Sequence, residues 1–232
     1  MAVKVFVLGR PGSGKSTAIR MMCNIAQCRG WPVIRVNDFD ILKEMFQADI
    51  HHERFLPAAH GGFDVIDFSV LDTALEEVER RVRDQMFGVG KKLITIEFAR
   101  DDYSEALRLF SCVFLQDAYF LFIDAHIETC IQRIHRRVAY ADEGCPKPDN
   151  HFVSDEIVRS YYAKNNTQYM MYGLREEYDI NKWIKVIKNT STLEEFKNEV
   201  LDFVNIIFWR EEKLTFKNTG WPLLELSGSK KG

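Results

Sequence analysis

Residues 9–17 read Gly-Arg-Pro-Gly-Ser-Gly-Lys-Ser-Thr and come directly after a mostly apolar run, Val3–Leu8. That run is rich in β-branched and aromatic side chains, which predicts a buried strand. The following stretch, Thr17–Ala26, places its apolar side chains at helical spacing. A strand, a glycine-rich loop and a helix in this order are the context in which such a loop binds phosphate.

Each residue type in this phosphate-binding loop (residues 9–17) has a physical role. Gly9, Gly12 and Gly14 let backbone amides turn inward on phosphate oxygens without collisions of Cβ atoms. Lys15 supplies a charge for the β- and γ-phosphates, Ser16 supplies a hydroxyl for Mg²⁺, and the helix adds the positive end of its dipole. We therefore predict a nucleoside triphosphate site built from Gly9, Arg10, Pro11, Gly12, Ser13, Gly14, Lys15, Ser16 and Thr17.

Composition limits the alternatives. The chain has 232 residues, 46% of them hydrophobic and 28% charged, which suits one soluble α/β domain with an inserted lid. The net charge of −3 provides no global basic field for a long polyanion. The five cysteines lack zinc-type or CxxC spacing, which predicts reduced core thiols in a cytoplasmic protein. Neither a signal peptide nor a membrane span is expected, and the oligomeric state is left open.

Alternating apolar runs and helical stripes predict a three-layer α/β sandwich with a five-stranded parallel sheet. Amphipathic spacing predicts helices at 39–47, 71–86 and 192–208, and further helices begin near Asp101, Ile127 and Ser154. Residues 139–153 are predicted to be a mobile excursion and 226–232 a frayed tail, so the domain spans 1–225. The expected strands are Val3–Leu8, Pro32–Val36, Lys92–Phe98, Tyr119–Asp124 and Trp183–Lys188.

The sequence lacks the motifs that define two other classes of nucleotide-binding protein. A GTPase carries an Asn-Lys-x-Asp guanine reader, whereas Asn181-Lys182 is followed here by Trp183-Ile184. A mechanical ATPase needs an acidic pair after an apolar strand, whereas Asp124 is followed by Ala125-His126. Both classes are therefore disfavoured.

The segment from Ile123 to Arg137 resembles the fourth strand and lid-entry helix of small-molecule P-loop kinases, the group that includes adenylate and shikimate kinases. Arg133 and Arg137 are four residues apart, so both project from one helical face. The resemblance implies that Arg133 lies against the adenine and that Arg137 reaches the phosphates. A solvated basic helix end is the alternative interpretation. In these kinases a lid, here about 133–159, closes over the site, and an insertion, here about 49–70, binds the acceptor.

Two further segments resemble the same kinases. Ile94–Arg100 resembles their third strand, which implies that Glu97 lies beside Mg²⁺ and that Arg100 grips the phosphoryl acceptor. These two residues match neither the adenylate kinase nor the deoxynucleoside kinase pattern fully. Ile184–Glu195 resembles the last strand and turn, which places Asn189 near the adenine, while Thr192–Glu195 also reads as a helix-capping box.

The acceptor side is predicted from Val36-Asn37-Asp38-Phe39-Asp40, because the carboxyl end of this strand faces the γ-phosphate. Asp38 is the candidate base for an attacking hydroxyl, as in polynucleotide 5′-kinases, and Asp40 is a substrate contact or a helix cap. Asp38 as a simple cap of the next helix is the competing interpretation. Arg159 either joins the lid arginines or is a charge on a helix surface. Phe55, Phe63 and Phe68 could stack on a ring, although such aromatics are more often core.

The hypothesis is an ATP- and Mg²⁺-dependent kinase that acts on a small-molecule hydroxyl, nucleoside-like in character. Lys15, Arg133 and Arg137 would neutralise the transferred phosphoryl group, with Asp38 as the base. The alternatives are a nucleoside monophosphate kinase, a polynucleotide 5′-hydroxyl kinase and a non-enzymatic nucleotide-dependent switch. A nucleic-acid end is the less favoured partner, because the protein is acidic.

Overall fold

A computed structural model describes residues 1–58, 62–88, 90–142 and 153–218. Its centre is a parallel sheet of five strands in the order β2-β5-β1-β6-β7. The strands are β1 (Ala2–Leu8), β2 (Val33–Asn37), β5 (Lys92–Phe98), β6 (Ala118–Asp124) and β7 (Ile184–Lys188). All five predicted strands are confirmed, because the three central ones carry long apolar runs that a sheet covered on both faces requires.

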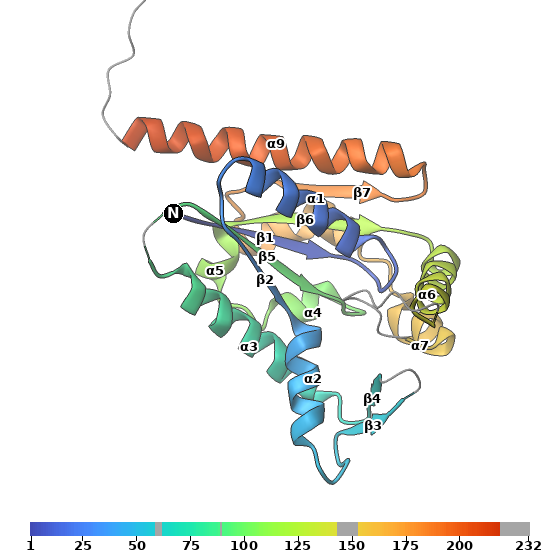
Figure 1. The fold of residues 1–232 in the computed structure, drawn as a ribbon. Coiled ribbons are helices and arrows are strands. Elements are labelled where there is room, and N and C mark those ends of the chain that lie inside the picture. The colour runs from blue at the N-terminus through green and yellow to red at the C-terminus, as the bar shows by residue number, and fades with distance from the viewer. Residues whose placement is uncertain (59–61, 89, 143–152, 219–232) are drawn as a thin grey trace, which may run out of the picture.

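Helices cover both faces of the sheet and make a sandwich of three layers (Figure 1). One face carries α1 (Lys15–Cys28) and α9 (Leu193–Asn218), which pack with Val5, Val7 and Leu121. The other carries α3 (Ser69–Met86), α4 (Tyr103–Leu107), α5 (Cys112–Gln116) and α8 (Leu174–Tyr178). On that face Phe6 and Phe120 stack with ring centroids 4.8 Å apart at the centre of the core. The predicted fold class is confirmed.

The remaining elements lie around the carboxyl ends of the strands. α2 (Asp38–Ala48) leads to a two-stranded antiparallel hairpin, β3 (Phe55–Pro57) and β4 (Phe63–Val65), within the expected acceptor segment. α6 (Ile127–Asp142) and α7 (Asp155–Ser160) lie side by side at the same end of the sheet (Figure 1). The 3₁₀ turn η2 (Tyr161–Ala163) and the π-helix η3 (Tyr169–Gly173) follow α7.

Two features differ from the sequence prediction. The β3–β4 hairpin is not among the predicted strands, because three-residue strands are too short to show an alternating pattern. α9 runs to Asn218, ten residues beyond the predicted end at Phe208. The apolar stripe ends near Phe208, but the sequence has no glycine or proline until Gly220, so nothing stops the helix there.

Several predictions fall on residues outside the described ranges. These are residues 59–61 of the expected acceptor segment, residues 143–152 of the predicted excursion, which include one of the five cysteines, and the 226–232 tail. Cys23, Cys28, Cys112 and Cys130 are free thiols. No helix in the described ranges combines the length and the apolar character that crossing a bilayer requires.

Candidate active site

The phosphate-binding loop joins β1 to α1 at the carboxyl edge of the sheet. Gly9 has a φ of +143° and Gly14 a φ of +117°, both in the region that favours glycine. A Cβ atom at Gly9 would lie 2.4 Å from the backbone oxygen of Ile123. A Cβ atom at Gly14 would lie 2.7 Å from Nδ2 of Asn189. The loop is therefore held tightly against β6 and β7, and its shape depends on these glycines.

Gly9→Ala is expected to lower the free energy of unfolding by about 3 kcal/mol, because strain at positive φ and a collision with backbone add together. Gly30→Ala is the matched control, since Gly30 has a φ of +72° but open space around its Cβ position. The control should lose about 1 kcal/mol. Urea unfolding curves measure both, and equal losses would show that the contact with Ile123 has no cost.

Lys15 lies at the start of α1 and is buried, with 8% of its surface exposed. Its Nζ donates to the backbone oxygens of Gly9 at 2.9 Å and Arg10 at 3.1 Å. Burial lowers the pKa of Lys15, while the nearby carboxylates of Glu97 and Asp38 act in the opposite direction. The ammonium group is thus bonded to the backbone of the loop and is close enough to Glu97 and Asp38 to interact with their charges.

Asn189 and Arg133 support the loop from the other side. Asn189 Nδ2 donates to the Ser13 oxygen at 2.7 Å, and Arg133 Nη1 donates to the same oxygen at 3.2 Å. Arg133 Nη2 also reaches Asn189 Oδ1 at 3.4 Å. Arg133 lines the pocket described below, whereas Asn189 is 4% exposed and does not. The structure thus shows Asn189 supporting the loop from behind, and its place beside an adenine stays a prediction.

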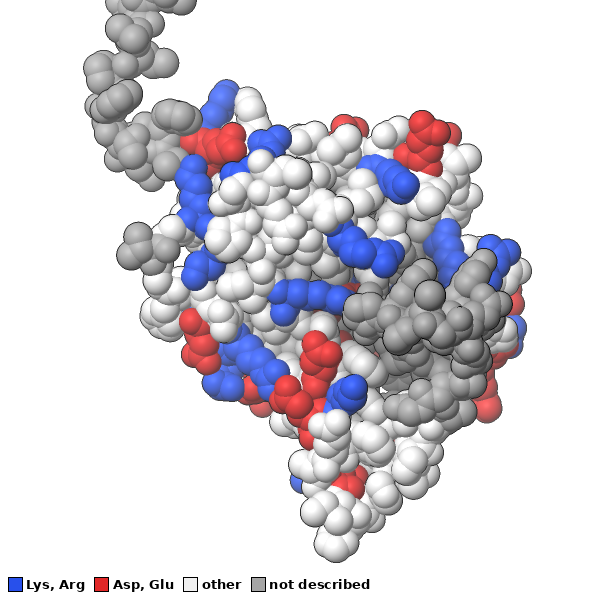
Figure 2. Space-filling model, in the orientation of Figure 1, with Lys and Arg blue, Asp and Glu red and all other residues white. Residues whose placement is uncertain are grey.

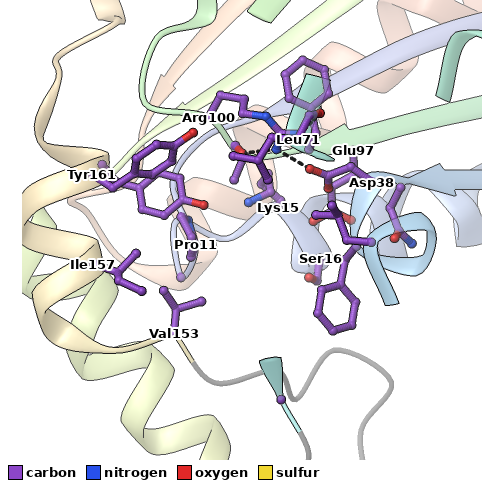
Figure 3. Close-up of a pocket in the computed structure, with 18 of the residues that line it drawn as sticks. Pro11, Lys15, Ser16, Asp38, Leu71, Glu97, Arg100, Val153, Ile157 and Tyr161 are labelled. Atoms are coloured by element: carbon purple, nitrogen blue, oxygen red, sulfur yellow. Dashed lines mark hydrogen bonds and ion pairs between the residues drawn. The ribbon is translucent and has the colours of Figure 1, made fainter. Parts of the chain in front are cut away.

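Asp38 and Arg100 form a buried ion pair across the ends of β2 and β5. Arg100 Nη1 donates to Asp38 Oδ2 at 2.5 Å, and its Nη2 donates to the Leu71 oxygen at 2.7 Å (Figure 3). The exposed fractions of the two side chains are 6% for Arg100 and 11% for Asp38. Burial acts to lower the pKa of Arg100, but Asp38, Tyr162 and Tyr161 together outweigh it and the pKa is raised. Arg100 therefore stays charged and holds the Asp38 carboxylate in one position.

The interpretation of Asp38 as a helix cap is wrong. Asn37 is the N-cap of α2, because its Oδ1 accepts a hydrogen bond from the Asp40 amide at 2.7 Å. Asn37 Nδ2 also donates to Asp40 Oδ2 at 2.7 Å. Asparagine and aspartate are equally favoured at this position, so the sequence could not distinguish them. With the cap supplied by Asn37, the Asp38 side chain is available to the pocket.

Glu97 ends β5 one strand away from the loop and has an ion pair of its own. Arg35, on β2, donates through Nη2 to Glu97 Oε2 at 2.7 Å. The sequence analysis did not identify Arg35, because an arginine in a strand has no signal until the neighbouring strand is known. Arg35 is thus the partner of the Glu97 carboxylate, which lies near the end of an otherwise apolar strand.

These groups surround one pocket with a volume of about 620 Å³. Figure 3 shows Tyr161, Ile157 and Val153 on one side and Ser16, Asp38 and Glu97 on the other, with Lys15 between them. Its other borders are α2 and β4, which contribute Phe39 and Phe63 as stacked rings 5.6 Å apart. The cations that line it are Lys15, Arg20, Arg35, Arg100, Arg133, Arg136 and Arg137. The carboxylates that line it are Asp38, Asp40, Asp64 and Glu97.

The pocket brings together most, but not all, of the predicted site residues. Arg137, Asp40 and Thr17 line it as expected. Arg159 does not line it: its side chain is half exposed on α7 and forms an ion pair with Glu128 at 3.0 Å, so the surface interpretation describes its position. The Arg10 side chain also points elsewhere, as described below. Lining residues that the sequence analysis did not identify are Arg20, Arg35, Phe39, Arg136, Tyr161 and Tyr162.

The residues present fit a nucleoside triphosphate and Mg²⁺. The positive-φ glycines form a cradle that a Cβ atom would fill, and Lys15 lies within it. The Ser16 side chain and Glu97 are oxygen donors that line the same pocket, and oxygen is the ligand that Mg²⁺ prefers. In the described part of the chain, no group of three or more His, Cys, Asp or Glu side chains forms a separate metal site.

The sequence matches no protein-family model and no curated protein. Among solved structures, it is similar to the APS kinase of Mycobacterium tuberculosis in complex with AMPPNP and APS, at 16% identity and a TM-score of 0.51. That match covers 88% of this chain and 98% of the other. A sugar kinase of a Janibacter species matches at 15% identity and a TM-score of 0.46, covering 89% and 96% of the two chains. Shikimate kinase of Acinetobacter baumannii in complex with shikimate matches at 14% identity and a TM-score of 0.43. That match covers 95% of this chain and 97% of the other. The fold is that of P-loop small-molecule kinases.

Proposed function

We propose that this protein is an ATP-dependent phosphotransferase that moves the γ-phosphoryl group to a hydroxyl of a small, uncharged, nucleoside-like acceptor. The observation that carries the proposal is the position of the Asp38–Arg100 pair, which lines the same pocket as Lys15 and Ser16 of the phosphate-binding loop. A carboxylate held at this place is suited to accept a proton from an attacking hydroxyl. A phosphate acceptor is already ionised and needs no such base.

The reaction breaks one bond and forms one. The acceptor hydroxyl gives its proton to Asp38, whose Oδ2 is bonded to Arg100 and whose Oδ1 remains to accept it. The acceptor oxygen bonds to the γ-phosphorus, the bond from that phosphorus to the β,γ-bridging oxygen breaks, and ADP leaves. Lys15, Arg133 and Arg137 are placed to neutralise the charge on the transferred group.

Mg²⁺, held through Ser16 with Glu97 beside it, would supply further neutralisation of the phosphate oxygens and fix their geometry. Arg35 holds the Glu97 carboxylate in place through its ion pair. The side chains at the end of the sheet would therefore orient the reactants and supply charges that stabilise the transferred group. Positioning and electrostatic stabilisation account for most of the catalysis of phosphoryl transfer.

The distribution of charge around the pocket favours an uncharged acceptor. Arg35 and Arg100, the cations on the acceptor side, are already paired with Glu97 and Asp38. Two more carboxylates, Asp40 and Asp64, line this side from α2 and β4. The cations on α1 and α6 face the pocket from the side of the phosphate-binding loop. A second anion would meet these carboxylates, which disfavours a nucleotide acceptor.

Aromatic rings favour an acceptor with a flat face. The Phe39–Phe63 pair borders the pocket from one side, and Tyr161 borders it from the other. Such rings bind planar groups by offset stacking, worth about 0.5–1.5 kcal/mol beyond area burial. Among the described residues on the face shown in Figure 2, positive and negative side chains are interspersed and form no continuous basic strip. This arrangement fits a small molecule better than a polynucleotide.

The test is phosphoryl transfer from radiolabelled ATP with Mg²⁺ to four panels of acceptors: nucleosides, monosaccharides, nucleoside monophosphates and 5′-hydroxyl oligonucleotides. We expect label on an uncharged compound, nucleosides first. Transfer confined to monophosphates or to oligonucleotides would overturn the assignment of the acceptor. Tight binding of MgATP by calorimetry without transfer to any panel would favour the nucleotide-dependent switch instead.

A further inference from the structure

Arg10, the second residue of the phosphate-binding loop, points away from the pocket and binds a segment more than 150 residues later in the chain. Its Nε donates to the Tyr162 oxygen at 2.7 Å, and its Nη2 donates to the Lys164 oxygen at 2.8 Å. Its Nη1 reaches Asp124 Oδ1 and the Ala125 oxygen, each at 3.3 Å. The side chain is 12% exposed. All three nitrogens of the guanidinium group are thus used in bridging the loop to other elements.

A second set of bonds joins the loop to the same segment. The Gly9 amide donates to the Tyr103 hydroxyl at 2.8 Å, and the Tyr103 amide donates to Asn166 Oδ1 at 3.1 Å. Asn166 Nδ2 donates to the Asp101 oxygen at 2.7 Å and contacts the Lys164 oxygen at 3.3 Å. The two routes meet at Lys164, so the first two loop residues and residues 162–166 form a closed ring of hydrogen bonds.

The segment that Arg10 holds is also a wall of the pocket. Tyr161 and Tyr162 line it, and we call these two residues the acceptor wall. Burial raises the pKa of Tyr162, and the charges of Arg100 and Asp38 act on the same group. The acceptor wall therefore stands beside the ion pair to which the proposed function assigns the proton transfer.

The loop backbone at Gly9 and Arg10 is also where Lys15 is bound in this structure. Lys15 Nζ donates to both of their carbonyl oxygens. An ammonium group has three donors, so phosphate oxygens that bind it compete with these carbonyls. Binding of a triphosphate thus changes the bonding of the residues from which the Arg10 bridge starts.

We propose that Arg10 is a positioning residue that transmits the binding of nucleotide in the loop to the acceptor wall. The proposal rests on the proposed function only in that a nucleotide binds the loop. The guanidinium fork spans three carbonyl groups and one carboxylate at once, which a lysine ammonium on one flexible stem does not reproduce. Loss of the fork should leave nucleotide binding in place and uncouple the acceptor wall from it.

Hydrogen–deuterium exchange of the full-length protein, with and without Mg²⁺ and AMPPNP, tests this without knowledge of the acceptor. In the wild-type protein we expect AMPPNP to slow exchange in residues 9–17 and in residues 161–167. In Arg10→Ala, the protection of 9–17 should remain, while that of 161–167 should fall at least three-fold. Arg10→Lys keeps the positive charge near Asp124 and replaces the alanine variant if that variant does not fold. It should show the same fall in the protection of residues 161–167.

Arg175→Ala is the matched control. Arg175 also donates to two backbone oxygens, those of Ile180 and Lys182, at 2.7 and 3.0 Å, but it does not line the pocket. This control should keep the protection of 161–167. Equal protection of 161–167 in wild type and both Arg10 variants would overturn the positioning role. Absence of protection at 9–17 in the wild-type protein would instead contradict nucleotide binding itself.

Discussion

Lys15→Ala is expected to lower kcat/KM for phosphoryl transfer by about 10²–10³-fold, the usual effect of removing one preorganised donor to a developing charge. The ammonium group is buried at the centre of the phosphate-binding loop, where few other donors can replace it. Burial lowers the pKa of Lys15, so the ammonium form is less favoured here than in water. Bound phosphates would favour that charged form. Steady-state assays with the acceptor identified by the panel measure the loss.

The fold should survive this substitution. The two hydrogen bonds lost are those to the Gly9 and Arg10 oxygens, worth about 1.5–3 kcal/mol each for a charged donor. The cost of burying the ammonium group is removed with them, which offsets part of this loss. Lys43→Ala, on the exposed surface of α2, is the matched control and should keep full activity. A Lys15→Ala protein that is folded, by circular dichroism and unfolding curves, and that retains most of the activity would remove the phosphotransferase hypothesis.

Asp38→Asn is expected to lower kcat for a hydroxyl acceptor by about 10²–10⁴-fold, because the amide cannot take the proton. A variant that transfers phosphate at the wild-type rate would show that the acceptor needs no base, which favours the monophosphate alternative.

The same substitution leaves the buried Arg100 without its counter-charge, so it should also lower the free energy of unfolding by about 3–5 kcal/mol. Glu211→Gln separates the two effects. Glu211 is 4% exposed and is paired with Lys182 at 2.6 Å, away from the pocket. It should lose comparable stability and, below its unfolding temperature, keep the transfer rate. If Glu211→Gln loses activity as strongly as Asp38→Asn, the loss reports on folding and not on proton transfer.

The strands and the main helices were predictable because each carries its own periodic signal. β1 has six buried positions in seven, and α3 buries Val70, Ala74, Leu75, Val78 and Val82 at helical spacing. The β3–β4 hairpin carried no such signal, because its pairing of Phe55 with Val65 depends on contacts between short segments. The end of α9 was misplaced for a related reason, since the apolar stripe in the sequence ends near Phe208 while the helix runs to Asn218.

For the candidate site as well, some residues were predictable from the sequence and others were not. Lys15 and Asp38 were identified from their places in the loop and at a strand end, and Glu97 and Arg100 from the resemblance to P-loop kinases. The structure brings all four around one pocket. Their partners were not identified. Arg35 on Glu97, Asn37 as the cap of α2, and Asn189 behind the loop are pairings between residues whose separation in sequence gives no hint of contact.

The amino-acid sequence alone was enough to establish a phosphate-binding loop between a buried strand and a helix, and with it the parallel α/β fold, because these depend on residue type and short spacing. Tertiary structure alone decided which charges are neutralised, which way Arg10 points and which rings border the acceptor. Those properties depend on distances between elements far apart in the chain, and the free energy of a charge or a hydrogen bond is set by its surroundings after folding.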